Sequence, residues 1–195
     1  MGVRGMENSQ IQVTVKQAEL SIMKGDITQQ ATAAIVNAAN SSLMGGGGVD
    51  GAIHRAGGSA ILEECKDIVS RQGCLPTSKA VLTTAGNLKA KYVIHTVGPI
   101  WRGGSKGEAK LLESAYRQSL ELAAENHLSS ISFPSISTDA YGYPVDSAAR
   151  VALMVVSSFL RKSVTSIKEA VFVLFGSRAF DAYSSALKEI KEEIN

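Results

Sequence analysis

Strand-like and helical segments alternate along the second half of this 195-residue chain, and that alternation constrains the fold more than any other feature. A helical periodicity over residues 108–125 precedes the buried strand SISFPSIS. An apolar helix over residues 145–160, the strand EAVFVLFG and an amphipathic helix over residues 179–194 complete the pattern. Because helices that alternate with strands cover both faces of a sheet, the pattern predicts a three-layer α/β fold with a largely parallel central sheet.

The first half of the chain supplies further strands and one interrupted helix. IQVTV and LSIMKGD indicate an opening hairpin, AAIVNAA a buried strand, and KAVLTTAG and KYVIHTVG two more strands. The pattern from residue 49 to about residue 71 is helical, with a break at Gly57 and Gly58. No internal repeat or linker divides the sequence, so we predict one domain over residues 9–195 after a flexible tail of residues 1–8.

Charge, hydropathy and cysteine usage argue against several classes of function. A net charge of +2 argues against a nucleic-acid partner, and no apolar run approaches the roughly 20 residues that cross a bilayer. Cys65 and Cys74 form neither a disulfide framework nor a metal-ligand pattern. They are typical of free thiols in a reducing compartment, so we predict a cytoplasmic protein.

Four segments follow predicted strands at the sheet edge where α/β proteins collect their ligands: KGDIT, NAANSSLMGGGGVD, SISTDAYGYP and FGSRAF. The second contains four consecutive glycines, Gly45 to Gly48, ahead of a helix. Glycine amides and a helix N-terminus together favour an anion such as phosphate. Gly46, Gly48 and Gly51 also satisfy the dinucleotide pattern G-x-G-x-x-G. However, about nine residues separate the strand from the glycines, which argues against a nicotinamide or flavin fold.

Asp50 and Asn40 flank the glycine run. Taken alone, Asp50 is an ordinary first-turn acid of a helix, and Asn40 is an ordinary turn residue. Because both flank one loop and both can orient a hydroxyl group or a water, we interpret them as a functional pair. His54 follows Asp50 by four residues on the same helix face, as a supporting residue or a packed histidine. No histidine stands at a recognised spacing from a serine or cysteine nucleophile, and His95 is interpreted as structural.

The segments KGDIT, IVNAAN, GGGGVDGAIHRAGG, YVIHTVGPIW and STDAYGYP, in this order, resemble the macrodomain family. The resemblance runs from Ile11 to the C-terminus and implies a three-layer α/β/α macrodomain sandwich with a mixed, largely parallel central sheet. The version GGVDGAIHRA is similar to the MacroD-like branch, whose members hydrolyse ADP-ribose esters. The resemblance implies removal of mono-ADP-ribose from acidic side chains and deacetylation of O-acetyl-ADP-ribose, without a metal or a redox cofactor. The implied partners are therefore ADP-ribose, ADP-ribosylated proteins and O-acetyl-ADP-ribose.

The resemblance also implies a role for each matching position. Asp50 would orient the attacking water, Asn40 would bind the distal ribose, and His54 would support them. Asn37 would support the glycine loop. The other implied ligand contacts are Asp26 and Ile27 at the adenine, Phe175 stacked on it, Gly47, Gly48 and Val49 at the diphosphate, and Ser137, Thr138, Asp139, Ala140 and Tyr141 over the distal phosphate and ribose.

Asp139 departs from the family pattern, in which glycine usually holds this place in the phosphate-binding turn. Aspartate tolerates a positive φ only moderately, and a carboxylate about 4 Å from a phosphate would repel it by roughly 1 to 4 kcal/mol. The departure raises an alternative function, a non-catalytic module whose binding of ADP-ribose is weakened by Asp139. An RNA binder is a third possibility, and the small net charge argues against it.

Overall fold

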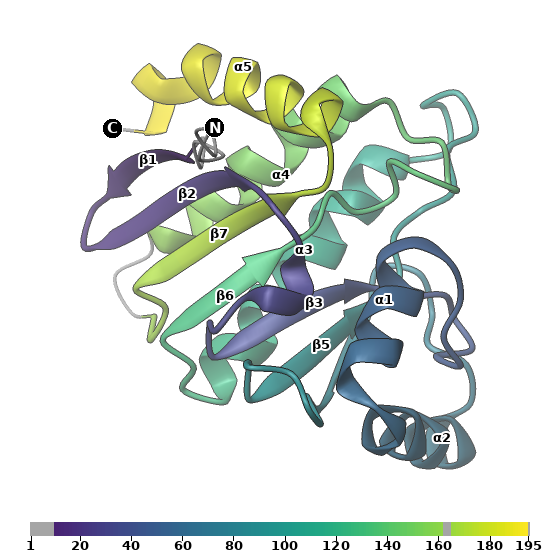
Figure 1. Cartoon of the computed structure of the whole chain (residues 1–195). Helices are drawn as coiled ribbons and strands as arrows, with labels where there is room; N and C mark the ends of the chain where they lie inside the picture. The colour runs from purple at the N-terminus through teal and green to yellow at the C-terminus, as the bar shows by residue number, and fades with distance from the viewer. Residues whose placement is uncertain (1–9, 162–164, 195) are drawn as a thin grey trace, which may run out of the picture.

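A mixed sheet of seven strands runs through the centre of the computed structural model, which describes residues 10–161 and 165–194 (Figure 1). The strand order is β1-β2-β7-β6-β3-β5-β4. The inner neighbours pair in parallel, and the two edge strands β1 and β4 pair antiparallel, which confirms a mixed, largely parallel sheet. The strands are β1 Gln10–Val15, β2 Ala18–Lys24, β3 Ala34–Ala38, β4 Ala80–Thr84, β5 Tyr92–Thr96, β6 Ser130–Phe133 and β7 Glu169–Leu174.

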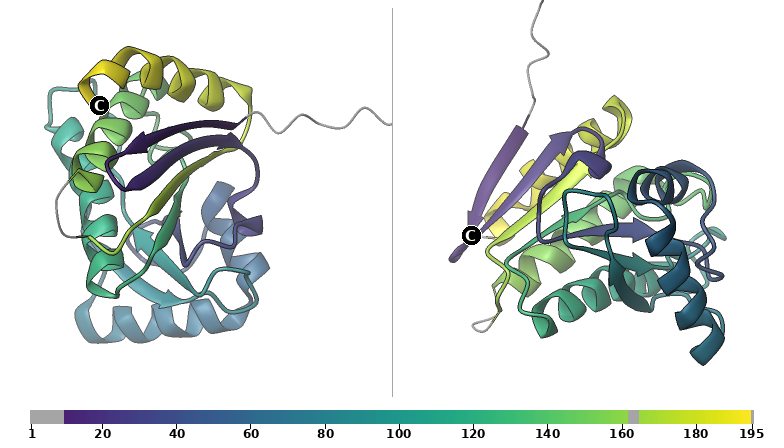
Figure 2. Two further views of the ribbon diagram at one scale, coloured as in Figure 1. Left: turned by 90° about the vertical axis from the view of Figure 1, so that its left-hand side faces the viewer. Right: turned by 60° about the horizontal axis from the view of Figure 1, so that its bottom comes forward.

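The helices form a layer on each side of this sheet (Figures 1 and 2). One hydrophobic cluster joins the sheet to α3, α4 and α5, and a second joins it to α1 and α2. The three-layer α/β/α architecture predicted from the sequence is therefore confirmed. The helices are the short 3-10 helix η1 Ile27–Gln29, α1 Gly48–Gly57, α2 Ser59–Gln72, α3 Glu108–Glu125, α4 Val145–Leu160 and α5 Ser177–Ile194.

Alternation along the strands decides which side chains lie under the site. In β3, Val36 packs in the cluster of α3–α5, whereas Ile35 packs in the cluster of α1 and α2. Because side chains alternate along a strand, Asn37 shares the face of Ile35. Asn37 is the register partner of His95 on the neighbouring strand β5. The two polar side chains thus lie side by side beneath α1.

Local signals explain where the predicted elements begin and end. The predicted break at Gly57 and Gly58 separates α1 from α2, and Gly58 has a φ of 81°. The predicted strand SISFPSIS ends at Phe133, because Pro134 has no N–H with which to extend the ladder. The predicted tail of residues 1–8 lies outside the described residues. No helix among the described residues is long and apolar enough to cross a membrane.

Candidate functional site

A cleft of about 310 Å³ opens where the parallel strands β3 and β6 end. Because the two strands are neighbours in the sheet, the loops that follow them lie opposite each other. The glycine loop after β3 forms one wall, and the loop after β6 forms the other. The lining residues are Ala38, Ala39, Asn40, Gly46, Gly47, Gly48, Val49, Asp50, Gly98, Ser135, Ile136, Ser137, Asp139, Ala140 and Tyr141.

The glycine wall leads into the N-terminus of α1. Gly47 is the N-cap of the helix and has no side chain with which to cap the free amides. Those first amides have no partner within the helix, and the helix dipole adds positive potential, so this end of α1 favours an anion. Asp50 lies in the first turn. A carboxylate thus stands at the edge of an anion-binding helix terminus.

The Asp50 carboxylate is held by one of its two oxygens. Oδ1 accepts a hydrogen bond of 2.7 Å from Nδ2 of Asn37 and lies 3.4 Å from Nε2 of His54. The 3.4 Å contact with His54 is not a hydrogen bond, and His54 Nε2 is buried without a hydrogen-bond partner among the described residues. Oδ2 faces Gly46, where an added Cβ would lie 3.1 Å from Oδ2 and 3.4 Å from Nδ2 of Asn40. The space between Asp50 and Asn40 therefore depends on the missing side chain of Gly46.

Asn40 shapes the loop that carries the glycines. Its Nδ2 donates a hydrogen bond of 2.8 Å to the carbonyl oxygen of Gly45, and its Oδ1 accepts a bond of 2.6 Å from the Ser42 hydroxyl. An asparagine side chain that bonds to the backbone a few residues ahead is a common way to fix a turn. The half-buried Asn40 also lines the cleft, so it can both fix the loop and contact a ligand.

Ser137 presents an unpartnered hydroxyl on the opposite wall. Its Oγ is buried and has no hydrogen-bond partner among the described residues, and its φ is 68°. Gly98, at the end of β5, lies so close that an added Cβ would overlap Ser137 Oγ. Unpartnered buried polar atoms are rare in native proteins. The Ser137 hydroxyl therefore has hydrogen-bonding capacity that no described protein group uses.

Asp139 is exposed and lines the cleft. The predicted backbone strain at this position is wrong, because Asp139 is not among the residues with positive φ; the left-handed positions of this loop are Ser137 and Gly142. The carbonyl of Asp139 accepts a turn hydrogen bond of 2.9 Å from Gly142 N. The turn therefore closes without a glycine at position 139. The predicted repulsion between this carboxylate and a phosphate stays a prediction.

Comparison with known proteins decides the family. Residues 36–152, more than half of the chain, match the family model described as Macro domain. The chain belongs to the macro domain family. A macro domain-containing protein of Caldanaerobacter subterraneus is 60% identical over 172 residues, which cover 88% of this chain and 97% of that protein.

Further relatives of this macro domain carry more specific names. A Salmonella typhimurium protein named O-acetyl-ADP-ribose deacetylase is 53% identical over 172 residues, covering 88% of this chain and 96% of that protein. The Oceanobacillus iheyensis macrodomain, solved with ADP, has a TM-score of 0.92 and 41% identity over 96% of this chain and 100% of that one. The Trypanosoma brucei macrodomain, solved with ADP-ribose, has a TM-score of 0.78 and 37% identity over 86% and 68% of the two chains.

Most of the predicted site residues line the cleft of this macro domain, and the others lie around it. Asn37 and His54 lie behind Asp50, as described above. Phe175, just after β7, is 90% exposed. The Asp26 carboxylate, after β2, caps the turn of η1 by accepting bonds from the Thr28 N–H and hydroxyl. Because β2, β7, β6 and β3 are successive neighbours, these positions lie along one edge of the sheet. Ile27 is buried and Thr138 half-buried, and neither lines the cleft.

Some lining residues were not predicted from the sequence. Gly98 belongs to the segment YVIHTVGPIW, which carried the family resemblance but had no assigned role. A glycine shortly after a strand can mark a place where another segment packs closely, and Ser137 packs closely against Gly98 here. Five further lining residues belong to the two predicted ligand loops but had no individual role assigned: Ala38, Ala39, Gly46, Ser135 and Ile136.

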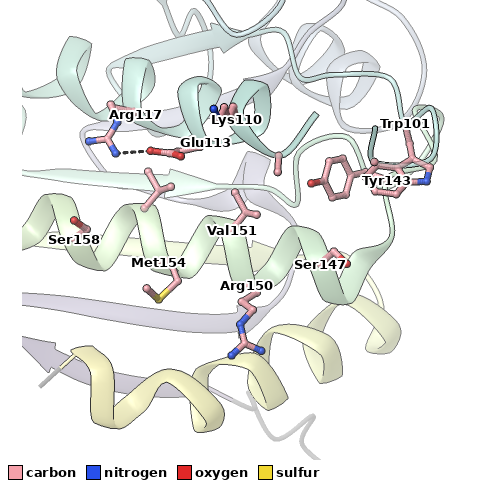
Figure 3. A pocket seen from close by; sticks show the side chains of 13 residues that line it. Trp101, Lys110, Glu113, Arg117, Tyr143, Ser147, Arg150, Val151, Met154 and Ser158 are labelled. Atoms are coloured by element: carbon pink, nitrogen blue, oxygen red, sulfur yellow. Dashed lines mark hydrogen bonds and ion pairs between the residues drawn. The ribbon is translucent and has the colours of Figure 1, made fainter. Parts of the chain in front are cut away.

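A larger hollow of about 690 Å³ lies between α3 and α4 (Figure 3). The aromatic rings of Trp101 and Tyr143 close one end, and Met154 lies along its α4 side. It is rimmed by the ion pair of Arg117 with Glu113, with 2.7 Å between the charged atoms. None of the predicted site residues lines this hollow. The anion-binding features described above belong to the smaller cleft.

A buried cluster of potential metal ligands lies beneath Asp50. One atom from each of His54, Cys65 and His95 falls within 4.8 Å of the others. Burial, followed by the negative charges of Asp50 and Glu64, raises the pKa of the Cys65 thiol to about 12. Burial, followed by the charge of His54, lowers the pKa of His95 to about 3. Cys65 and His95 are therefore uncharged at neutral pH, and a metal ion here would have to displace a thiol proton.

Proposed function

We propose that this macro domain binds ADP-ribose and hydrolyses its esters, in the manner of the MacroD-like branch. The reactions are deacetylation of O-acetyl-ADP-ribose and removal of mono-ADP-ribose from acidic side chains. The observation that carries the proposal is the Asp50 carboxylate, which is anchored by Oδ1 and directs Oδ2 toward the cleft beside the N-terminus of α1. The ADP and ADP-ribose in the solved macrodomains and the name of the Salmonella typhimurium relative support the proposal.

The ligand lies along the sheet edge in this proposal. The diphosphate rests on the amides of Gly47, Gly48 and Val49 and meets the Ser137 hydroxyl. The adenine lies toward the ends of β2 and β7, and the distal ribose reaches Asn40 and Asp50. The ligand contacts away from the diphosphate are proposed for Asp26, Ile27, Phe175, Thr138, Asp139, Ala140 and Tyr141.

Asp50 serves as general base in the proposed reaction. A water between Asp50 Oδ2 and the ester gives up a proton as its oxygen bonds to the carbonyl carbon. The bond from that carbon to the ribose oxygen then breaks, and the proton passes to the departing oxygen. The products are ADP-ribose and a carboxylic acid. General-base help of this kind is typically worth about 10²–10⁴ in rate, and the step needs neither a metal nor a redox cofactor.

Substitution of Asp50 tests the proposal. Asp50→Ala should abolish hydrolysis of both substrates while calorimetry shows ADP-ribose affinity within a few fold of wild type. Asp146→Ala is a matched control, because Asp146 is likewise a first-turn acid, on α4, and does not line the cleft. That control should hydrolyse normally. Unchanged turnover by Asp50→Ala would refute the assignment. An equal loss of turnover in Asp146→Ala would refute it as well.

A second candidate function is a module that binds ADP-ribose without catalysis. The observation that favours it is the exposed carboxylate of Asp139 on the cleft wall. Retained ADP-ribose binding, with no release of ADP-ribose from an automodified protein and no acetate from O-acetyl-ADP-ribose, would support this candidate. For either candidate we propose a cytoplasmic location, because free thiols such as Cys65 and Cys74 are typical of a reducing compartment. The proposed partners are ADP-ribosylated proteins or O-acetyl-ADP-ribose in both cases.

A further inference from the structure

Four buried side chains link the interior of the sheet to the cleft. Thr83 on β4, His95 on β5 and Asn37 on β3 are fully buried, and Asp50 on α1 is 5% exposed. We call these residues the buried network. Nδ2 of Asn37 lies 2.7 Å from Asp50 Oδ1 and 3.0 Å from His95 Nδ1, and Nε2 of His95 lies 2.9 Å from the Thr83 hydroxyl. A continuous path of hydrogen bonds therefore reaches Asp50 from beneath.

The directions of these bonds fix the tautomer of His95. The Thr83 hydroxyl donates its only hydrogen to the carbonyl oxygen of Thr84, at 2.9 Å. We therefore assign the hydroxyl as the acceptor at its contact with His95 and place the His95 proton on Nε2. Nδ1 then carries a lone pair, which accepts from Nδ2 of Asn37. The Cys65 sulfur, 3.8 Å from Nε2, lies on the same donor side of the ring.

The same reasoning fixes the amide of Asn37. Its two N–H groups point to His95 and to Asp50, while its Oδ1 is buried without a hydrogen-bond partner among the described residues. An unpartnered buried carbonyl is costly, so the opposite rotation would be adopted if it gave better contacts. That rotation would direct Oδ1 at the carboxylate of Asp50 and at a lone pair of His95. Both neighbours require a donor, and together they hold the amide in place.

We propose that His95 is a positioning residue for hydrolysis, because its Nδ1 lone pair holds the Asn37 amide in the orientation that presents an N–H to Asp50. This inference rests on the proposed function of Asp50. His95 has no access to substrate, and it acts through Asn37. By fixing one carboxylate oxygen, the buried network leaves the other directed at the cleft.

The surroundings keep this arrangement constant across the physiological pH range. The titratable groups that face the buried network are His54 from α1, and Cys65 and Glu64 from α2. Burial holds the pKa of His95 near 3, so the ring stays neutral and its Nδ1 stays an acceptor at neutral pH. The buried network is therefore a fixed support and not a pH switch in this range.

Two substitutions of His95 separate its acceptor from its donor. In His95→Asn, the side-chain oxygen can occupy the place of Nδ1 and accept from Asn37, although the donor to Thr83 is lost. In His95→Gln, the amide reaches the place of Nε2 and can serve Thr83, although the acceptor for Asn37 is lost. We expect His95→Asn to keep kcat within a few fold of wild type and His95→Gln to lower kcat about tenfold or more. KM and the ADP-ribose Kd should change little in either variant.

A second pair of variants guards against misfolding at position 95. Thr83→Val removes the hydroxyl at nearly constant volume, and Thr83→Ser restores it. The inference predicts a fall in kcat for Thr83→Val that Thr83→Ser reverses, at unchanged ADP-ribose affinity. Equal kcat in His95→Asn and His95→Gln, or losses that simply follow the melting temperature across all four variants, would overturn it.

Nitrogen NMR of the His95 ring tests the buried network without any assay of turnover. Wild type should show a neutral ring with the proton on Nε2 at pH 7. A proton on Nδ1, or an imidazolium at pH 7, would refute the inference even in an active enzyme. Failure of wild type to hydrolyse O-acetyl-ADP-ribose would instead refute the proposed function and leave the NMR result to judge the buried network.

Discussion

Asn37 donates a hydrogen bond of 2.7 Å to Oδ1 of Asp50 from the strand beneath the glycine loop. The carboxylate is therefore oriented by the sheet, although it belongs to a helix that begins in a run of glycines. This division between an anchored and a free oxygen is what distinguishes Asp50 from an ordinary first-turn acid. The following predictions test the parts of the site that depend on it.

Gly46 keeps open the space in which the proposed water lies. In Gly46→Ala the new methyl would stand 3.1 Å from Asp50 Oδ2 and 3.4 Å from Asn40 Nδ2, so kcat should fall about tenfold or more, as the water is excluded. Because the φ of Gly46 is not positive, the melting temperature should change little. Gly25→Ala is the comparison, since its φ is not positive, a Cβ there would make only ordinary contacts of 3.6 Å or more, and Gly25 does not line the cleft. Full turnover by Gly46→Ala at saturating substrate would contradict the placement of the water.

We expect Ser137 to contribute to ADP-ribose affinity and not to stability. Ser137→Ala removes a buried hydroxyl that has no protein partner, so the melting temperature should stay the same or rise slightly. Loss of its bond to the diphosphate should weaken ADP-ribose binding about five- to tenfold in calorimetry. Ser119→Ala should do the reverse, because the Ser119 hydroxyl bonds to Ala115 O at 2.8 Å and lies on α3, outside the cleft lining. A destabilised Ser137→Ala of normal affinity would contradict this role.

We expect the charge of Asp139 to weaken ADP-ribose binding. Asp139→Asn keeps the size of the side chain and should tighten ADP-ribose binding about fivefold, which corresponds to about 1 kcal/mol of repulsion removed. The gain should shrink as salt screens the exposed charge. Asp139→Gly should bind no better than Asp139→Asn, because the φ of Asp139 is not left-handed. Equal affinity of wild type and both variants would mean that the carboxylate turns away from the phosphate.

His95 makes stability sensitive to acid. The native pKa of about 3 lies below the ordinary value of 6.5, so the unfolded state binds a proton as the pH falls through that window and the native state does not. The stabilisation is complete above pH 6.5 and is lost as the pH falls toward 3. Urea titrations should show wild type losing about 2–3 kcal/mol more than His95→Asn between pH 7 and 4.5. Parallel losses in the two proteins would contradict the shifted pKa.

The helices and strands could be predicted from the sequence because each leaves a pattern in neighbouring residues. The bounds of α3 and α4 match the predicted ranges, since the 3.6-residue repeat of apolar side chains begins and ends with the helices. The break between α1 and α2 was predicted because two adjacent glycines mark it. Strand β6 is shorter than predicted, because Pro134 ends the ladder inside the segment SISFPSIS.

The architecture of the site depends on contacts that no local pattern encodes. Asn37 and His95 are far apart in sequence and meet only through the register of β3 with β5. The sequence pattern therefore predicts only a structural role for His95, and the family resemblance implies only that Asn37 supports the glycine loop. Likewise, the non-glycine residue with a positive φ in the second loop is Ser137, which packs against Gly98 from another strand end, and not Asp139.

The central claim is that the carboxylate of Asp50 drives ester hydrolysis in this cleft. The most direct test is the rate of acetate release from O-acetyl-ADP-ribose by wild type and by Asp50→Asn, which keeps the shape of the side chain. The account predicts steady release by wild type and a rate at least about 100-fold lower for Asp50→Asn, with ADP-ribose Kd within a few fold. Equal rates for the two proteins would contradict it.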